Sequence, residues 1–226
     1  MVITQNRPPL STPSPKPAKP LATTCEEKTA APDSADLSLY QMANSGVSVM
    51  AGLTQGLTRI IVGGCAGAAQ GIVHGADLKE DQARLAFKVA MGANLAATGA
   101  LAGGVAGLDF LALSPSQGAV AGAATNVMVG QSTWDASPGA FQDKVRQTSD
   151  AWMESTLQHL PDSISHNPGL LAKVTRSTLG NFVGLAAGAY TGVTSLGSNY
   201  REGHAWGDRA FKKAANFFAA PPTTEG

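Results

Sequence analysis

Charged side chains are scarce in this sequence, and neither sign is in excess. Lysine plus arginine number 16 and aspartate plus glutamate number 16, so the formal net charge is +0. Charged residues make up 14% of the chain, whereas soluble domains average about 25%. Because nucleic-acid-binding domains carry a basic excess, this balance argues against a nucleic-acid partner.

Cysteine is rare as well, which excludes a disulfide framework. Cys25 lies in a proline-rich segment and Cys65 in an apolar run, so the two are not an expected pair. Cys65 fits the role of a small buried hydrophobic residue. The first residues of the chain lack the continuous apolar core of a Sec signal peptide, and we therefore expect no such signal.

Catalytic motifs are missing from the sequence. We find no GxxxxGK[ST], GxGxxG, GxSxG, HExxH or CxxC pattern. The histidines show no ligand spacing, and a solvated helix face explains why Asp150 and Glu154 lie one turn apart. The sequence therefore predicts a protein that is not an enzyme, with no cofactor, no metal site and no small-molecule substrate.

Proline is concentrated near the N-terminus, where it alternates with serine, threonine, lysine and alanine. Such a segment cannot bury enough apolar surface to offset the entropy lost on ordering. We predict that residues 1–36 form a disordered tail, that residues 37–220 form a helical domain, and that residues 221–226 are disordered. The tail fits either a plain linker or a secretion leader of the kind that bacterial type III substrates carry.

Alternation of strand type is nearly absent from the remaining residues, whereas helical periodicity is common, so we predict an all-α fold. A first helix is expected from residues 36–39 to about 75, with a break allowed near residues 44–46. We place a tight turn at residues 75–77 and a second helix over residues 78–113. Asp77 and Glu80 have the spacing of a capping box at the start of that helix.

Three later helix starts are marked by a capping residue followed by proline, at Ser114-Pro115, Ser137-Pro138 and Asn167-Pro168. These pairs predict an apolar helix to about residue 130, an amphipathic connecting helix over residues 139–160, and a further helix to about residue 196. A short last helix is expected over residues 205–219, before Pro221-Pro222.

Glycine, in contrast, is abundant, with 26 residues, although each glycine inside a helix costs about 0.5–1 kcal/mol relative to alanine. Residues four apart share one stripe of a helix, and a stripe without side chains lets a second backbone approach closely. The expected bundle is therefore packed through glycine zippers, which also allow a homo-oligomer. The predicted helix-packing residues are Gly63, Gly67, Gly71, Gly75, Gly99, Gly103, Gly107, Gly180, Gly184, Gly188 and Gly192.

These glycine faces resemble those of the mitochondrial Tim17/Tim22/Tim23 translocase family and of some membrane-inserting bacterial proteins. The resemblance covers residues 63–75, 99–107 and 180–192. The Arg/Asp-containing signature of the translocase family is not found in this chain. The resemblance therefore implies a manner of helix packing, and neither an activity nor functional residues.

Long apolar stretches make a lipid bilayer the expected partner. Residues 57–76, 89–113 and 178–197 reach the roughly 20 residues that a span needs, and residues 115–134 are marginal. Arg59 and Asp109 would be costly in lipid unless paired, but the turn at residues 75–77 places them several turns apart. We expect a membrane-inserting or membrane-associated protein, such as a bacterial secreted factor; the alternative is a soluble interaction module, cytoplasmic or secreted.

The last predicted helix has the composition of a helix that lies on a membrane surface. About fifteen residues are too few to cross the hydrocarbon core, and basic residues would be costly inside it. Docking of Trp206 and Phe217 into a groove of the protein's own helices is the alternative. The predicted membrane-surface residues are Trp206, Arg209, Lys212, Lys213, Phe217 and Phe218.

Overall fold

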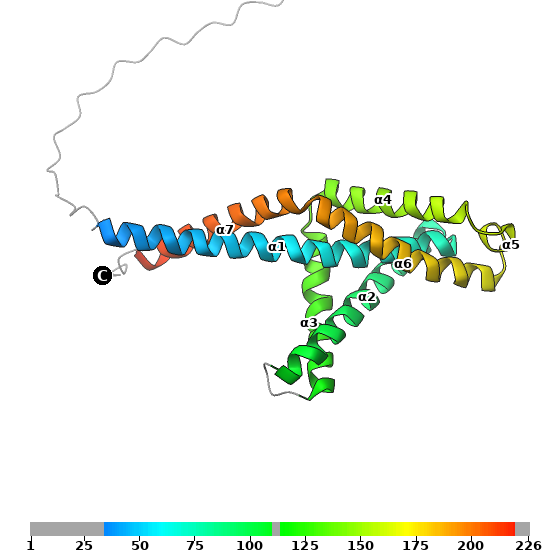
Figure 1. Cartoon of the computed structure of the whole chain (residues 1–226), viewed down its shortest axis with the longest axis horizontal. Helices are drawn as coiled ribbons and strands as arrows, with labels where there is room; N and C mark the ends of the chain where they lie inside the picture. Colours follow the sequence, from blue (N-terminus) through cyan, green and yellow to red (C-terminus); the bar gives the residue numbers. More distant parts are fainter. Residues whose placement is uncertain (1–33, 110–113, 220–226) are drawn as a thin grey trace, which may run out of the picture.

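The computed structural model describes residues 34–109 and 114–219, and the predicted all-α fold is confirmed there, with no strand in those two ranges (Figure 1). The expectations for residues 1–33, 110–113 and 220–226 lie outside the described residues. The helices are α1 (Ser34–Ala76), α2 (Glu80–Asp109), α3 (Pro115–Asp135), α4 (Gly139–Leu157), α5 (Asp162–Ser165), α6 (Leu170–Thr194) and α7 (Leu196–Ala219).

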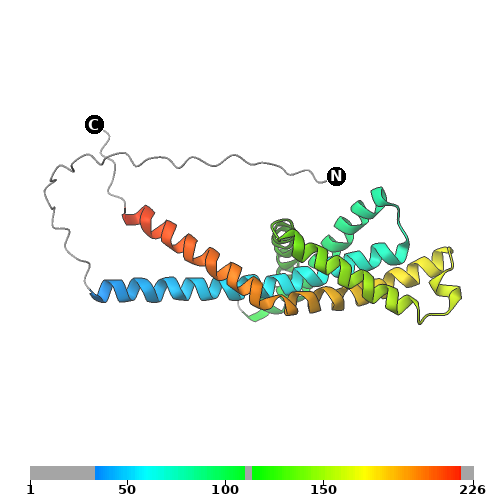
Figure 2. The ribbon, with the colours of Figure 1, turned by 90° about the horizontal axis from the view of Figure 1, so that it is seen from above.

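The long helix α1 organises the molecule. Helices α6 and α7 follow it in the opposite direction, and α4 packs on α1 and α6 (Figure 1). Figure 2 shows a bend between α6 and α7, which falls at Ser195. Helices α2 and α3 pair with each other and extend away from this layer as a hairpin (Figure 1).

Helix α1 is continuous over 43 residues, so the break allowed near residues 44–46 is absent. The Asn44 side chain donates a hydrogen bond to Asp208 of α7 at 2.7 Å, and the Asn44 carbonyl accepts one from the Ser48 hydroxyl at 2.8 Å. Contacts with α7 therefore hold a segment whose own sequence has low helix propensity.

The chain reverses at Asp77, as the predicted turn required. Asp77 has a φ of 52°, and its N–H donates to the His74 carbonyl at 3.1 Å. A residue in this left-handed conformation ends a helix. The predicted capping box is wrong, because α2 begins at Glu80 and the Lys79 carbonyl accepts its first hydrogen bond, from Ala83.

Of the three predicted capping residues, Ser114 alone caps its helix. Its side chain accepts a hydrogen bond from the Gln117 N–H, and the Gln117 side chain accepts one from the Ser114 N–H, which is a complete capping box. Ser137 instead donates its hydroxyl to the Thr133 carbonyl at 2.6 Å, and Pro138 holds the N-cap position of α4.

The start and the end of α6 also differ from the prediction. The Asn167 side chain accepts a hydrogen bond from the Gly169 N–H at 2.7 Å, and α6 begins after Gly169. The helix ends at Thr194, and α7 then begins at Leu196 rather than near residue 205. The short helix α5, between α4 and α6, was not predicted.

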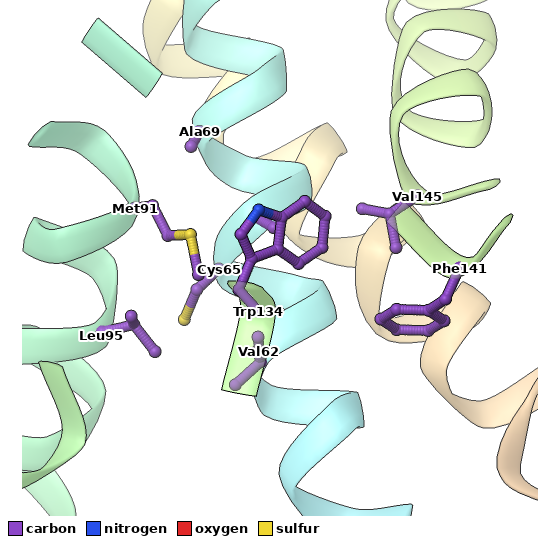
Figure 3. Packing of buried hydrophobic residues seen from close by; sticks show 9 residues of the cluster. Val62, Cys65, Ala69, Met91, Leu95, Trp134, Phe141 and Val145 are labelled. Atoms are coloured by element: carbon purple, nitrogen blue, oxygen red, sulfur yellow. The ribbon is translucent and has the colours of Figure 1, made fainter. Parts of the chain in front are cut away.

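The hydrophobic core lies where α1, α2, α3 and α4 meet. Figure 3 shows Met91 and Leu95 of α2 on one side of Trp134, with Phe141 and Val145 of α4 on the other. Cys65 is 1% exposed here, in agreement with its expected role. The cluster joins the base of the hairpin to the layer, and its other buried members are Val62, Ala66 and Ala69.

Arg176 is buried where α1 ends, and among the described residues its guanidinium binds carbonyl groups alone. Its Nε donates to the Gly75 carbonyl at 3.1 Å, and its Nη1 donates to the carbonyls of Ile164 at 2.6 Å and Asn167 at 2.8 Å. A cation at a helix C-terminus also interacts favourably with the helix dipole. Arg176 therefore connects the end of α1 to the segment that precedes α6.

Replacing Arg176 with methionine should lower the free energy of unfolding by about 3 kcal/mol or more, because hydrogen bonds to charged groups contribute about 1.5–3 kcal/mol each. Urea denaturation would measure the change. Arg201→Met is the matched control, since Arg201 is exposed and, within residues 34–109 and 114–219, its one hydrogen bond is to Gly197 of its own helix. Equal stability of the two variants would contradict this role of Arg176.

Candidate functional site

Helices α1 and α6 approach each other along glycines that the spacing had singled out. A β-carbon added at Gly67 would meet the Gly184 carbonyl oxygen, and one added at Gly71 would meet that of Gly180. At Gly63, the Gly188 oxygen would lie 2.9 Å away. On α6, β-carbons added at the partner glycines would in turn meet carbonyl oxygens of α1: Gly180 meets Gly71, Gly184 meets Gly67, and Gly188 meets Gly63. We call these six residues, Gly63, Gly67, Gly71, Gly180, Gly184 and Gly188, the glycine seam.

The close approach continues at both ends of the seam. A β-carbon at Gly75 would lie 2.5 Å from the Arg176 carbonyl, and one at Gly192 would lie 2.6 Å from Ile60 Cα. Farther along α1, a β-carbon at Gly52 would lie 2.8 Å from the Tyr200 ring of α7. The α6–α7 pair therefore follows α1 closely on both sides of the bend.

In the hairpin, a smaller set of glycines brings the backbones of α2 and α3 close together. A β-carbon at Gly99 would meet the Gly122 carbonyl oxygen, and one at Gly103 would meet that of Gly118. Gly107 lies in α2, but its surroundings fall outside the described residues. The backbones of α2 and α3 are therefore nearly in contact over more than one turn.

Arg59 of α1 is 3% exposed and is bound by α7. Its Nη1 donates to the Asn199 side chain and to the Glu202 carboxylate, both at 2.7 Å. These partners were not predicted from the sequence, because the last helix was expected to begin near residue 205, after both Asn199 and Glu202. The side chain of Asp109, considered above as a partner of Arg59, lies outside the described residues.

A second polar cluster joins α1 to α4. His74 Nδ1 lies 3.2 Å from the Asp150 carboxylate, which also accepts a hydrogen bond from Gln70 at 3.0 Å. The hydrogen bond to Asp150 raises the pKa of His74 despite the opposing effect of burial. Burial would raise the pKa of Asp150, but the hydrogen bonds from His74 and Gln70 outweigh it and lower that pKa.

We expect thermal stability to fall as the pH rises above about 6.5, the ordinary pKa of histidine. A raised pKa in the folded state stabilises the protein at lower pH, and this contribution is lost as the pH rises through the raised pKa. The contribution of Asp150 is present at these pH values and is lost only in acid, through its lowered pKa. The melting temperature should fall more between pH 6 and 8 in the wild type than in His74→Gln, and equal slopes would contradict the pairing.

Two helices in the described part are long and apolar enough to cross a membrane by length and composition, α1 over Ser38–Ala76 and α2 over Glu80–Ala106. The two helices differ in burial. In an apolar stretch of 18 residues, 61% is buried in α1 but 22% in α2. That stretch of α1 is thus largely buried in the core, although Met42, Met50 and Leu53 nearer the start of α1 are exposed, whereas the stretch in α2 is largely exposed. The expected stretch at residues 178–197 is interrupted, because α6 ends at Thr194.

The hairpin surface is apolar and free of charge over most of its length. Asp109 is the one charged residue in the sequence between Lys88 and Asp135. Leu101 is 75% exposed in α2, and Val120 is 72% exposed in α3. Other exposed apolar side chains on these two helices are Val89, Val105, Met128 and Val129.

The predicted membrane-surface residues of α7 are all exposed. They are Trp206, Arg209, Lys212, Lys213, Phe217 and Phe218. Helix α7 does pack on α1, but through other residues: a β-carbon at Gly203 would lie 2.7 Å from the Ala51 carbonyl, and the Phe211 ring lies 5.1 Å from that of Tyr40. Packing on α1 thus leaves Trp206 and Phe217 on the surface.

No family model, curated protein or solved structure matches the chain. Among the described side chains, no group of three or more histidine, cysteine, aspartate or glutamate residues could hold a metal ion.

Proposed function

We propose that this protein acts on membranes without catalysis, by inserting the α2–α3 hairpin into a lipid bilayer. One observation carries the proposal: helices that are free of charge between Lys88 and Asp109, and between Ser114 and Asp135, present exposed apolar side chains. An apolar surface of this extent is unusual on a soluble monomer and is typical of sites that contact a membrane or another protein.

The dimensions of the hairpin support this proposal. At a rise of 1.5 Å per residue, residues 96–108 of α2, which lie beyond the core residue Leu95, form a helix of about 20 Å, enough to enter but not to cross the hydrocarbon core of about 30 Å. The part of α3 between Pro115 and Val127, where the core contacts begin, has a similar length, so the hairpin could enter the bilayer and return to the same side. Helix α1 is left outside, because its apolar window is mostly buried against other helices.

Two polar side chains of the hairpin, Asn126 and Thr98, have hydrogen-bond partners within it. In hydrocarbon, backbone and side-chain polar groups must be satisfied within the protein. The Asn126 side chain donates to the Leu95 carbonyl at 2.7 Å, and the Thr98 hydroxyl donates to the Asn94 carbonyl at 2.8 Å. These bonds supply internal partners for polar side chains that would otherwise oppose insertion.

Helix α7 supplies a second, shallower contact in this proposal. Its exposed Trp206, Phe217 and Phe218 could enter the headgroup boundary, while Lys213 and Arg209 meet anionic headgroups. A hairpin that inserts and a helix that lies on the surface would together hold the protein more firmly than either alone.

Flotation with phosphatidylcholine vesicles, followed by a carbonate wash, tests the proposal. The full chain should float with the vesicles and resist carbonate, because an inserted hairpin is held by hydrophobic contacts rather than by charge. Protein that floats but is stripped by carbonate would show surface binding only. Protein that remains in solution would favour the alternative, a soluble module whose hairpin contacts another protein.

A further inference from the structure

A cleft of about 830 Å³ opens beside the base of the hairpin, between α2 and α3 on one side and α1 and α4 on the other. Its size falls within the range of small-molecule sites, about 300–1,000 Å³. Aromatic side chains and cations share its lining, and the residues that matter here are Arg84, Phe87, Lys88, Trp134 and Arg146.

The charge of the cleft favours an anion. Arg84 and Lys88 come from α2 and Arg146 from α4, against Glu80 and Asp135 in the same lining. Glu80 accepts a hydrogen bond from Arg84 at 3.0 Å, but both side chains are at least 80% exposed, so the pair is weak. Among the described side chains, no carboxylate forms a salt bridge with Lys88 or Arg146, although Arg146 lies close enough to Asp150, one turn along α4, to help lower the pKa of that carboxyl.

An aromatic ring positions one of these cations, Arg146. The Arg146 guanidinium lies 5.8 Å from the centroid of the Phe87 ring, within the range of a cation–π contact. The Phe87 ring in turn lies 5.9 Å from that of Trp134, which belongs to the core. Arg146 is thus linked through Phe87 to the hydrophobic core.

If the hairpin inserts as proposed above, the sequence indicates at which level of the bilayer the cleft would lie. The charge-free stretch of α2 begins directly after Lys88, and that of α3 ends directly before Asp135. The cleft residues would therefore lie at the level of the lipid headgroups, where lysine, arginine and aromatic residues are favoured.

We propose that this cleft binds the phosphate-bearing headgroup of an anionic phospholipid. Arginine and lysine can donate charge-assisted hydrogen bonds to phosphate oxygens from both α2 and α4. The acyl chains of the bound lipid would lie along the apolar hairpin surface that begins at Val89, which is 63% exposed. A soluble anion would bind the cations of the cleft but would not contact the apolar surface of the hairpin.

Calorimetric titration of the full chain with monomeric dihexanoyl phosphatidylglycerol tests the proposal without a bilayer. The triple variant Arg84→Gln, Lys88→Gln, Arg146→Gln should bind this lipid at least about tenfold more weakly than the wild type. A control variant, Lys144→Gln, Lys173→Gln, Arg201→Gln, removes the same charge outside the cleft and should bind as the wild type does.

The outcomes separate this proposal from the proposed function. Equal binding by the triple variant and the control, or equal binding of glycerol phosphate and the lipid, would overturn the lipid site. Flotation of the triple variant with phosphatidylcholine vesicles should be unchanged, because insertion into neutral lipid does not need the cleft. Lipid binding by the wild type without any flotation would overturn insertion and leave the headgroup site standing.

Discussion

Gly67→Leu and Gly184→Leu should each lower the free energy of unfolding by about 3 kcal/mol or more, at or beyond the upper end of ordinary overpacking. A β-carbon at Gly67 would meet the Gly184 carbonyl, and it would also lie 2.9 Å from both Gly188 Cα and Ser149 Oγ. Backbone atoms cannot rotate away as a side chain can, so α1 and α6 would have to separate. Chemical denaturation followed by circular dichroism would measure the loss.

Gly46→Ala is the control for this experiment. Gly46 lies within α1, and nothing lies within 4 Å of a β-carbon added there. Alanine is favoured over glycine inside a helix by about 0.5–1 kcal/mol, so this variant should be as stable as the wild type or slightly more stable. Similar stability of all three variants would contradict the view that the glycine seam holds α1 against α6.

Leu101→Lys should weaken insertion into phosphatidylcholine vesicles by a factor on the order of a hundred, since a lysine near the bilayer centre costs roughly 2.5–3.5 kcal/mol. The side chain is 75% exposed, so the substitution should leave the fold in solution unchanged. Vesicle flotation gives the fraction bound, and a melting curve in buffer reports on folding.

Leu170→Lys provides a matched comparison, because Leu170 is 80% exposed but lies at the start of α6, outside the hairpin. It should float as the wild type does. If the two lysine variants float equally well, the hairpin is not the part of the protein that enters the membrane.

The helix class and many helix ends follow from local chemistry, and these could be predicted. The capping box at Ser114 is complete within four residues and needs no other part of the chain. Ser137 also precedes a proline, but its hydroxyl bonds to the Thr133 carbonyl behind it. Serine can bond its own backbone in either direction at similar energy, so the sequence alone does not choose between them.

Features that depend on distant contacts could not be predicted. Gly197, Ser198 and Asn199 favour a loop by propensity, but Asn199 is 2% exposed and accepts a hydrogen bond from Arg59. Packing on α1 therefore extends α7 back to Leu196. The same extension brings Glu202 to Arg59, a pairing of residues far apart in the chain.

The candidate site was predicted in part. Four-residue spacing identified the glycines of α1 and α6, but it could not show that Gly67 lies opposite Gly184 and Gly103 opposite Gly118. Apolar length identified α1 and α2 alike as possible spans. Their different exposure depends on α6, α7 and α4, which cover α1 and leave most of α2 free.

A spin label at residue 105 tests hairpin insertion most directly. Val105→Cys would be labelled in a Cys25→Ser, Cys65→Ala background, with Leu170→Cys as the reference position; both native side chains are largely exposed. In the presence of phosphatidylcholine vesicles, the label at residue 105 should become accessible to oxygen and inaccessible to a water-soluble nickel chelate, while the label at residue 170 remains accessible to nickel. Equal nickel accessibility at the two positions would contradict insertion of the hairpin.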